Sequence, residues 1–250
     1  MSILVFIALF FPVLLSGLSV FLFRTGEKTM KLILAFGGGF LFSLTFIELI
    51  PEIYSRDAHY MGFFVLLGFF IQLLLDFITK GVEHGHHSQH ENLDQPCRKK
   101  KEPMVFLGLM IGICIHSFLE GMPLSTNFHN EELQGKLLTG IVIHNIPISI
   151  VLASLLLHTG MRKATTILLL LIFAFSSPLG TITSFFLGEN IIEDMSKFFS
   201  IILAIVVGIF LHISTTILFE SDGNHKFNFS KIFVILLGFS ATILLALLIH

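Results

Sequence analysis

Eight long apolar segments constrain the fold of this chain more than any other feature. Each is close to the roughly 20 residues that a helix needs to cross the hydrocarbon core of a bilayer. The segments are continuously apolar, whereas strands of a membrane barrel would alternate apolar and polar residues. The sequence therefore predicts an all-α polytopic membrane protein with eight transmembrane helices. They run approximately over 3–23, 31–54, 61–79, 103–126, 134–158, 165–187, 197–219 and 231–249.

Composition supports this class and argues against others. Hydrophobic residues make up 54% of the 250 residues and charged residues 13%, whereas soluble domains carry about 25% charged residues. No run of basic residues is interleaved with aromatic residues, so we expect no nucleic-acid partner. The two cysteines, Cys97 and Cys114, do not make a disulfide framework. We expect a single transmembrane domain over 1–250 with the lipid bilayer as its partner. A homodimer is left open.

The distribution of Lys and Arg predicts the orientation. Twelve of the 15 Lys and Arg residues fall in one set of loops, and three, Arg56, Lys136 and Lys197, fall in the alternate set. Loops rich in Lys and Arg stay in the cytoplasm. The sequence therefore predicts a multi-pass protein of the cell membrane with both termini outside and the 80–102 loop in the cytoplasm.

The 80–102 loop is the one long polar stretch, and it is rich in histidine. Four histidines fall within seven positions: His84, His86, His87 and His90. Imidazole suits zinc, copper, iron and nickel, and a His-rich tract is a compositional sign of metal binding. Because the tract lacks fixed ligand spacing, we expect weak, exchangeable metal capture. A flexible hydrophilic linker is the alternative interpretation.

The fourth apolar segment carries an imidazole and a carboxylate. His116 and Glu120 are four residues apart, which places them on one helix face, one turn apart. Both can therefore bind the same cation, and Ser117 can add an oxygen from an adjacent face. Ionisable groups inside a bilayer are costly and are functional candidates by default. A His–Glu pair that only joins helices is the structural alternative.

The fifth segment repeats this pattern with His144 and Asn145. Pro147 lacks the amide that would bond the carbonyl of Ile143, beside His144. At membrane depth a freed carbonyl is tolerated only where it is buried in protein or lines a cavity. The fourth segment also has a nearby proline, Pro123. Two histidines, each near a helix-breaking proline, favour metal ligands over simple helix contacts.

Other polar residues inside the spans have weaker signals. Glu48 precedes Glu52 by one turn at the end of the second span, and we expect Glu48 to join the metal path. Glu52 suits a solvated helix end or a gate. His212 in the seventh span is equally compatible with a metal ligand and a helix contact. Gln72 and Asp76 in the third span are expected to make helix contacts.

The chain resembles the ZIP family of zinc and iron permeases over its whole length. The stretch 116–121, His-Ser-Phe-Leu-Glu-Gly, looks like the family's fourth-span motif, and 144–147, His-Asn-Ile-Pro, looks like its fifth-span motif. The stretches 176–180 and 46–52 are similar to sixth-span and second-span patterns. The resemblance implies a ZIP-like bundle of eight spans, both termini outside and a His-rich cytoplasmic loop.

The resemblance also implies a metal site at mid-membrane between the fourth and fifth spans. Family members bind two metals there, but this chain has Ile148 where the family usually has His or Glu. Isoleucine cannot coordinate, so we predict a single-metal site. By resemblance, the first metal takes His116, Glu120 and His144, and the second takes Ser117 and Asn145 with Glu120 bridging.

These observations predict a transporter, not an enzyme, that moves divalent metal ions into the cytoplasm by a passive or proton-coupled route. Mixed imidazole and carboxylate ligands suit Zn²⁺ as the substrate and are also compatible with Fe²⁺ or Mn²⁺. The ion is expected to enter past Glu52 and Glu48 and to leave toward the histidines at 84–90.

Two alternatives remain open at this point. An intramembrane zinc-dependent hydrolase would hold its metal with His116, His144 and His212 and use Glu120 as the general base. A metal-binding relative that does not transport is suggested by Ile148.

Overall fold

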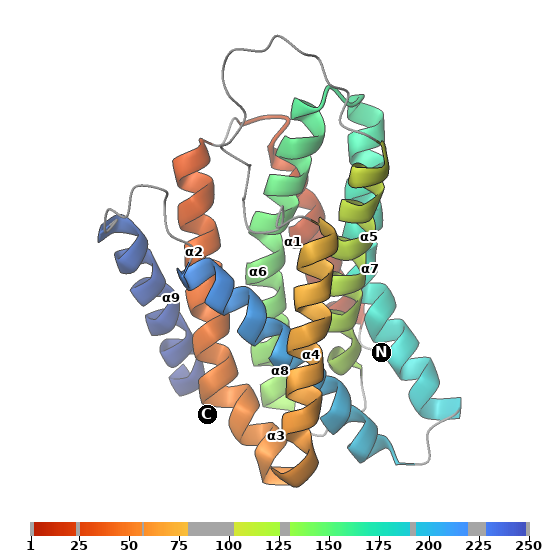
Figure 1. The fold of residues 1–250 in the computed structure, drawn as a ribbon, viewed down its shortest axis with the longest axis vertical. Helices are drawn as coiled ribbons and strands as arrows, with labels where there is room; N and C mark the ends of the chain where they lie inside the picture. The colour runs from red at the N-terminus through yellow and green to blue at the C-terminus, as the bar shows by residue number, and fades with distance from the viewer. Residues whose placement is uncertain are drawn as a thin grey trace.

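The computed structural model describes residues 3–23, 26–56, 58–79, 103–125, 131–190, 194–219 and 229–248, and these residues are all helix and turn (Figure 1). The elements are α1 (Ile3–Ser19), α2 (Glu27–Leu44), the π-helical turn η1 (Thr45–Leu49), α3 (Ile50–Arg56), α4 (Ala58–Thr79), α5 (Pro103–Gly121), the 3-10 turn η3 (Met122–Leu124), α6 (Glu131–His158), α7 (Lys163–Asn190), α8 (Met195–Phe219) and α9 (Phe229–Leu248).

The predicted all-α membrane class is confirmed. Within the described residues, seven helical segments are long and apolar enough to cross a membrane, with α2, η1 and α3 forming one of them. The remaining apolar helix, α1, has 17 residues. Together they correspond to the eight predicted spans. The His-rich stretch 80–102 lies outside the described residues, and the single-domain organisation stays a prediction.

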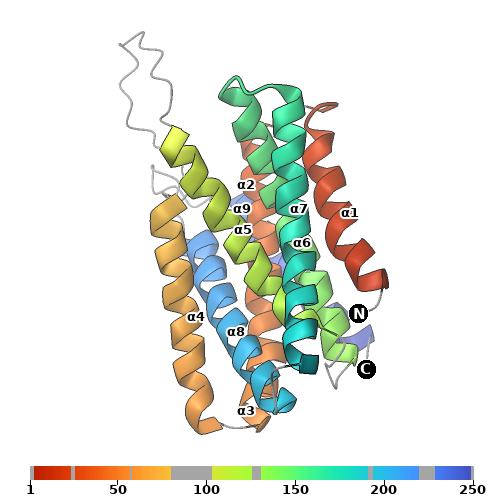
Figure 2. The ribbon, with the colours of Figure 1, turned by 90° about the vertical axis from the view of Figure 1, so that its right-hand side faces the viewer.

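The helices pack as two groups. In the first group α1 and α5 pack against α7, and α1 also packs against α6. In the second group α4 packs against α8, and α2 packs against both α8 and α9. Contacts of α2 with α6 and of α4 with α5 join the groups. Figure 2 shows α4 and α8 on one side and α1, α6 and α7 on the other.

Close helix pairs within each group depend on glycine. A Cβ atom on Gly68 of α4 would collide with the carbonyl of Ile205, and one on Gly208 of α8 would collide with the carbonyl of Val65. Helices in membranes use small residues in this way to bring their backbones together. Gly39 does the same for α2 against α9, where an added Cβ would collide with the carbonyl of Ile235.

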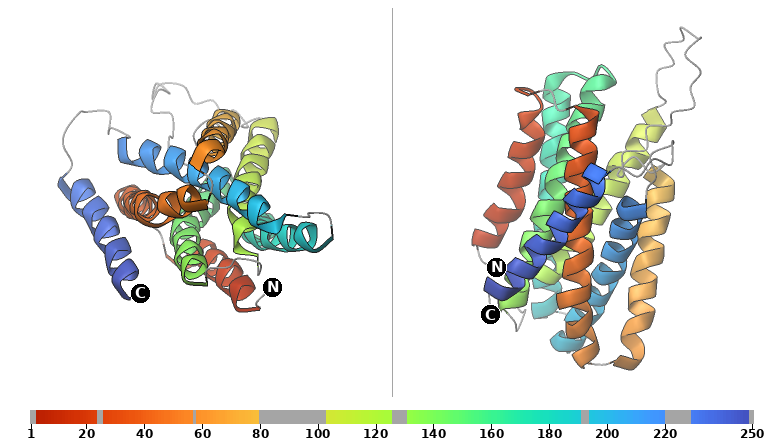
Figure 3. Two further views of the ribbon diagram at one scale, coloured as in Figure 1. Left: turned by 90° about the horizontal axis from the view of Figure 1, so that it is seen from below. Right: turned by 90° about the vertical axis from the view of Figure 1, so that its left-hand side faces the viewer.

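The outward face of the second group is apolar. The hydrophobic window of α4 is only 22% buried and that of α9 only 11% buried. Exposed side chains on these helices include Phe63 and Phe77 of α4 and Phe233 and Leu247 of α9. Figure 3 shows α9 at the rim of the bundle beside α2. Such a large exposed apolar surface is typical of contact with lipid tails.

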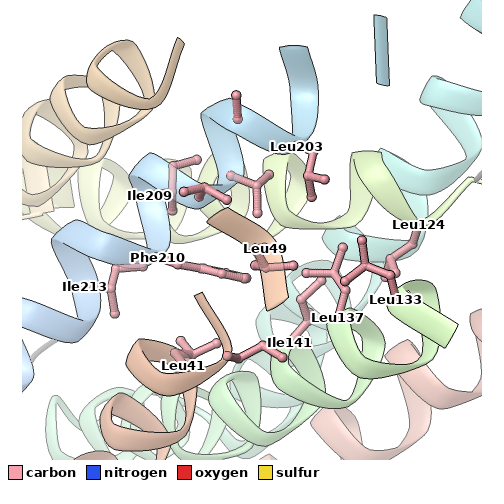
Figure 4. Close-up of a cluster of buried hydrophobic side chains, with 14 of the residues drawn as sticks. Leu41, Leu49, Leu124, Leu133, Leu137, Ile141, Leu203, Ile209, Phe210 and Ile213 are labelled. Carbon is pink, nitrogen blue, oxygen red and sulfur yellow. The ribbon is translucent and has the colours of Figure 1, made fainter. Parts of the chain in front are cut away.

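Two buried apolar clusters form the interior. One contains residues from α2, α6 and α8, including Leu41, Ile141 and Phe210, and lies where the two groups meet (Figure 4). The other is built from the first group and includes Phe10, Ile148 and Phe173. The first cluster borders the contact between α2 and α6, and α6 is the helix that carries His144.

The α2–α6 contact, called the α2–α6 seam below, is antiparallel. Gly37 of α2 lies beside His144, where an added Cβ would be 3.9 Å from the His144 Cα. Further along, Gly140 faces Leu44. Beyond that level, α2 continues through the wider π-helical turn η1 into α3. We call the end of the molecule where α3 is followed by α4 the α3 end (Figure 1).

Replacing Gly208 by alanine is expected to destabilise the fold by about 1–3 kcal/mol, because the added methyl group meets backbone that must move. Gly135→Ala is the matched control, since nothing lies within 4 Å of the Cβ it would add. Thermal unfolding of the purified variants in detergent measures both effects. Equal midpoints for the two variants would contradict the close α4–α8 packing.

Candidate metal centre

A buried group of two histidines and one glutamate lies between α5 and α6. The ligand atoms of His116, Glu120 and His144 all lie within 4.8 Å of one another, and all three residues are buried. Residues 116 and 120 share one face of α5 because they are one turn apart, and His144 lies at the middle of α6. The two imidazole rings meet edge to face, with their centroids 5.8 Å apart.

A glutamine on α4 orients the first imidazole. His116 Nδ1 lies 3.0 Å from Gln72 Oε1, and both residues are fully buried. Because an amide oxygen only accepts hydrogen bonds, Nδ1–H is the donor and Nε2 of the neutral ring keeps its lone pair. Histidines that bind metals commonly donate their other N–H in this way. Gln72 therefore fixes the tautomer that a metal ligand requires.

The arrangement of Nε2 and the carboxylate is suited to a shared cation. His116 Nε2 lies 3.1 Å from Glu120 Oε1, with both side chains fully buried. Two atoms bound to one zinc ion at about 2.0–2.2 Å are about 3.3–3.6 Å apart in tetrahedral geometry, slightly more than the separation found here. A proton or a metal ion between them removes the repulsion of two facing lone pairs. The pair therefore fits a cation site.

Asn145 positions the carboxylate. Its Nδ2 donates a hydrogen bond of 3.1 Å to Glu120 Oε2, which leaves Oε1 directed at His116. Asn145 Oδ1 is buried without a hydrogen-bond partner, so an amide oxygen is also present at the site. Ser117 is buried on α5, and its predicted role as a ligand stays a prediction.

The structure does not bring Glu48 into this group. Its carboxylate lies in η1 and accepts a hydrogen bond of 3.0 Å from Lys136 Nζ. Glu52 lies half-buried on α3. Assigning Lys136 to a loop was wrong, because it lies in α6 and is 1% exposed. Residues 131–136, Glu-Glu-Leu-Gln-Gly-Lys, are mostly polar, so the start of this helix was hard to separate from the preceding loop.

His212 lies between α4 and α8, outside the buried group. Its Nε2 is 3.8 Å from Asp76 Oδ2, and its ring meets the edge of Phe69. The structure thus places His212 in the contact between two helices and beside a carboxylate. Among the described residues, the three-histidine arrangement that a hydrolase would need is not formed.

Comparison with known proteins places the sequence of this chain in a family. The model of the ZIP zinc transporter family matches residues 1–104 and 80–246 of the chain. The chain belongs to the ZIP family. Protein zntD of Dictyostelium discoideum is 29% identical over 174 residues, which cover 67% of this chain and 25% of zntD. Zinc transporter ZIP9-A of Xenopus laevis is 25% identical over 167 residues, covering 65% of this chain and 52% of that protein.

The aligned part of the chain therefore spans about a quarter and about half of these two relatives. Zinc transporter ZIP9 of Xenopus tropicalis matches to the same extent as its Xenopus laevis counterpart. The predicted membership of the ZIP family is confirmed.

Ile148 packs among other apolar side chains. It is 3% exposed and belongs to the buried cluster that includes Ile113 and Leu152. Ile148 follows His144 by one turn of α6, and Ile113 precedes His116 on α5. Apolar side chains thus border the histidines of this ZIP protein on the side away from the α3 end.

Two polar residues, one at this centre and one further along α6, were not singled out from the sequence. Gln72 was expected to make only a helix contact, and its contact is with a candidate ligand. A polar residue in an otherwise apolar span was the available signal. Lys136 was not singled out because a lysine near the end of a span usually anchors the helix at the membrane interface.

Replacing Gln72 by leucine is expected to weaken zinc binding about 10–100-fold, because His116 loses the acceptor that fixes its tautomer. Gln72→Glu keeps an acceptor oxygen and is expected to lose less affinity. Isothermal titration of the purified variants with Zn²⁺ measures both. Wild-type affinity in Gln72→Leu would show that the hydrogen bond has no part in the metal centre.

Proposed function

We propose that this ZIP protein moves divalent metal ions across the membrane, with zinc as the main substrate and His116, Glu120 and His144 as the ligands. The observation that carries the proposal is the buried convergence of two imidazoles and one carboxylate between two spanning helices. An ionised carboxylate without a partner is very costly in an apolar interior. A site that receives a cation explains why Glu120 is there.

The donor set suits a transported ion. Three protein ligands leave a coordination position open, as in zinc sites that exchange a ligand. With one carboxylate and two neutral imidazoles, bound Zn²⁺ keeps a formal charge of +1, so the site does not fully neutralise its cargo. Nitrogen and oxygen ligands without a thiolate also suit Fe²⁺ and Mn²⁺, which we include as further substrates.

The proposed direction is inward, with the α3 end outside and both termini outside in a cell membrane. The support is the distribution of basic residues: twelve of the 15 fall in one set of loops and helix ends, and only Arg56, Lys136 and Lys197 fall in the alternate set. The ion would pass Glu52 and Glu48, bind at the three ligands and leave toward the histidine stretch at 84–90. Proton uptake by the site would weaken metal binding and favour release.

A single metal ion per chain is part of this proposal. Ser117 and Asn145 would need a further strong ligand to hold a second ion, and Ile148 instead joins an apolar cluster. The same feature motivates the rival function, a metal-binding protein that does not transport. Binding without flux would favour that rival.

Zinc influx into proteoliposomes that contain the purified protein is expected to fall to the level of protein-free vesicles in His144→Ala and Glu120→Ala. His158→Ala is the matched control, because it removes the same imidazole from the exposed end of the same helix. Influx in His158→Ala should match wild type. Undiminished influx in Glu120→Ala would contradict the proposed site.

The amount of bound metal gives a second, independent measurement. Elemental analysis after equilibration with Zn²⁺ should find a single ion per wild-type chain and almost none in Glu120→Ala. Two ions in the wild type would contradict the proposed effect of Ile148.

A further inference from the structure

A buried lysine links the two helix groups at the α3 end of the α2–α6 seam. Lys136 of α6 is 1% exposed, and its Nζ is 3.0 Å from Glu48 Oε1. The same ammonium group pairs with Glu132, one turn earlier on its own helix. Glu48 belongs to the second helix group and Lys136 to the first. We call Lys136–Glu48 the seam ion pair.

Local backbone structure holds Glu48 in this position. Glu48 lies in η1, where the Ile50 N–H bonds the Thr45 carbonyl five residues back instead of four. Pro51 follows and has no N–H to continue the regular pattern. Single π-helical turns are frequently found at functional sites. The widened turn therefore fixes a carboxylate opposite α6.

Along α6 the seam ion pair lies between the α3 end and the metal centre. Residues 136, 140 and 144 follow one another at four-residue intervals and so share a face of α6. Lys136 is about 12 Å along the helix axis from His144. Ile141 lies beside Leu41 between these two levels, and Leu137 lies in the same buried cluster at the level of Lys136 (Figure 4). Closure of the seam thus combines an ion pair with apolar packing.

The charges around Lys136 suit exchange with an arriving cation. Two carboxylates surround one ammonium group, so the cluster has a formal charge of −1 when all three are ionised. Glu48 is 17% exposed and Glu132 is 34% exposed, whereas Lys136 is enclosed. A surplus negative charge attracts cations to this end of the seam. If Glu48 turns to a metal ion, Lys136 keeps Glu132 as its partner.

We propose that Lys136 controls metal access to the centre: it closes the α2–α6 seam by holding Glu48, and a divalent cation arriving from the α3 end must take Glu48 from it. The inference rests on the proposed transport function for its metal step. It assigns Lys136 a positioning role and Glu48 the role of first acceptor of the ion. Breaking the pair opens the seam without touching the three ligands.

Thiol labelling tests the closing role without any metal flux. Leu137→Cys is introduced into a protein with Cys97→Ser and Cys114→Ser, and the protein in lipid nanodiscs is treated with a charged, water-soluble methanethiosulfonate. Leu137 is fully buried, so labelling should be slow with the seam ion pair intact. Lys136→Met and Glu48→Gln should each accelerate it on the order of tenfold or more, as expected when a buried pair is broken.

Three controls separate closure from general loosening. Glu132→Gln removes a carboxylate from the same ammonium group but leaves the seam ion pair, so labelling should stay near wild type. The charge-exchanged protein with Glu48→Lys and Lys136→Glu should be slow again. Leu152→Cys, buried beyond His144 from the α3 end, should label equally slowly in every variant. If Lys136→Met fails to fold, Glu48→Gln breaks the same pair.

Transport kinetics test the access step. Lys136→Met removes the competing cation and keeps Glu48, so the KM for zinc influx should fall about tenfold. Glu48→Gln removes the acceptor, so its KM should not fall. A role limited to stability would not separate the two variants in this way. Unchanged labelling at position 137 in both variants, or an unchanged KM in Lys136→Met, would overturn the proposal. Absence of wild-type flux would instead refute the proposed function, and the labelling result would still stand.

Discussion

The cost of placing Glu120 in a fully buried position constrains much of the surrounding structure. A carboxylate in an apolar interior must be neutralised or paired, and here it meets His116 at 3.1 Å and the amide of Asn145 at 3.1 Å. Gln72 in turn orients His116 from a third helix. Four polar side chains from three helices thus form one connected network, and His144 completes the ligand group from the middle of α6.

The α2–α6 seam joins the two helix groups. Helices within each group approach through glycine, with backbone against backbone at Gly68 and Gly208. Along the α2–α6 seam Gly37 lies beside the His144 backbone, and side chains make the other contacts, with Leu41 and Ile141 in the apolar cluster and Lys136–Glu48 near its end. Side-chain contacts between groups can be exchanged without unfolding either group. In the proposal made above, this seam is where the buried centre becomes accessible.

Much of the fold could be predicted from the sequence, because a bilayer allows few structures and long apolar runs determine which of them forms. The ligand group followed from the four-residue spacing of His116 and Glu120 and from the intramembrane His144. The partners of these residues could not be predicted in the same way. Gln72 and Lys136 acquire their roles from α4 and α2, and which helices become neighbours depends on packing that local spacing does not encode.

X-ray absorption at the zinc edge of the zinc-loaded protein in lipid tests the central claim most directly. The account predicts a shell of nitrogen and oxygen ligands at about 2.0–2.2 Å, with the scattering of two imidazoles. One imidazole should be lost in His144→Ala. A sulfur ligand from either cysteine, or a wild-type spectrum in His144→Ala, would contradict the assignment of His116, Glu120 and His144 as the metal centre.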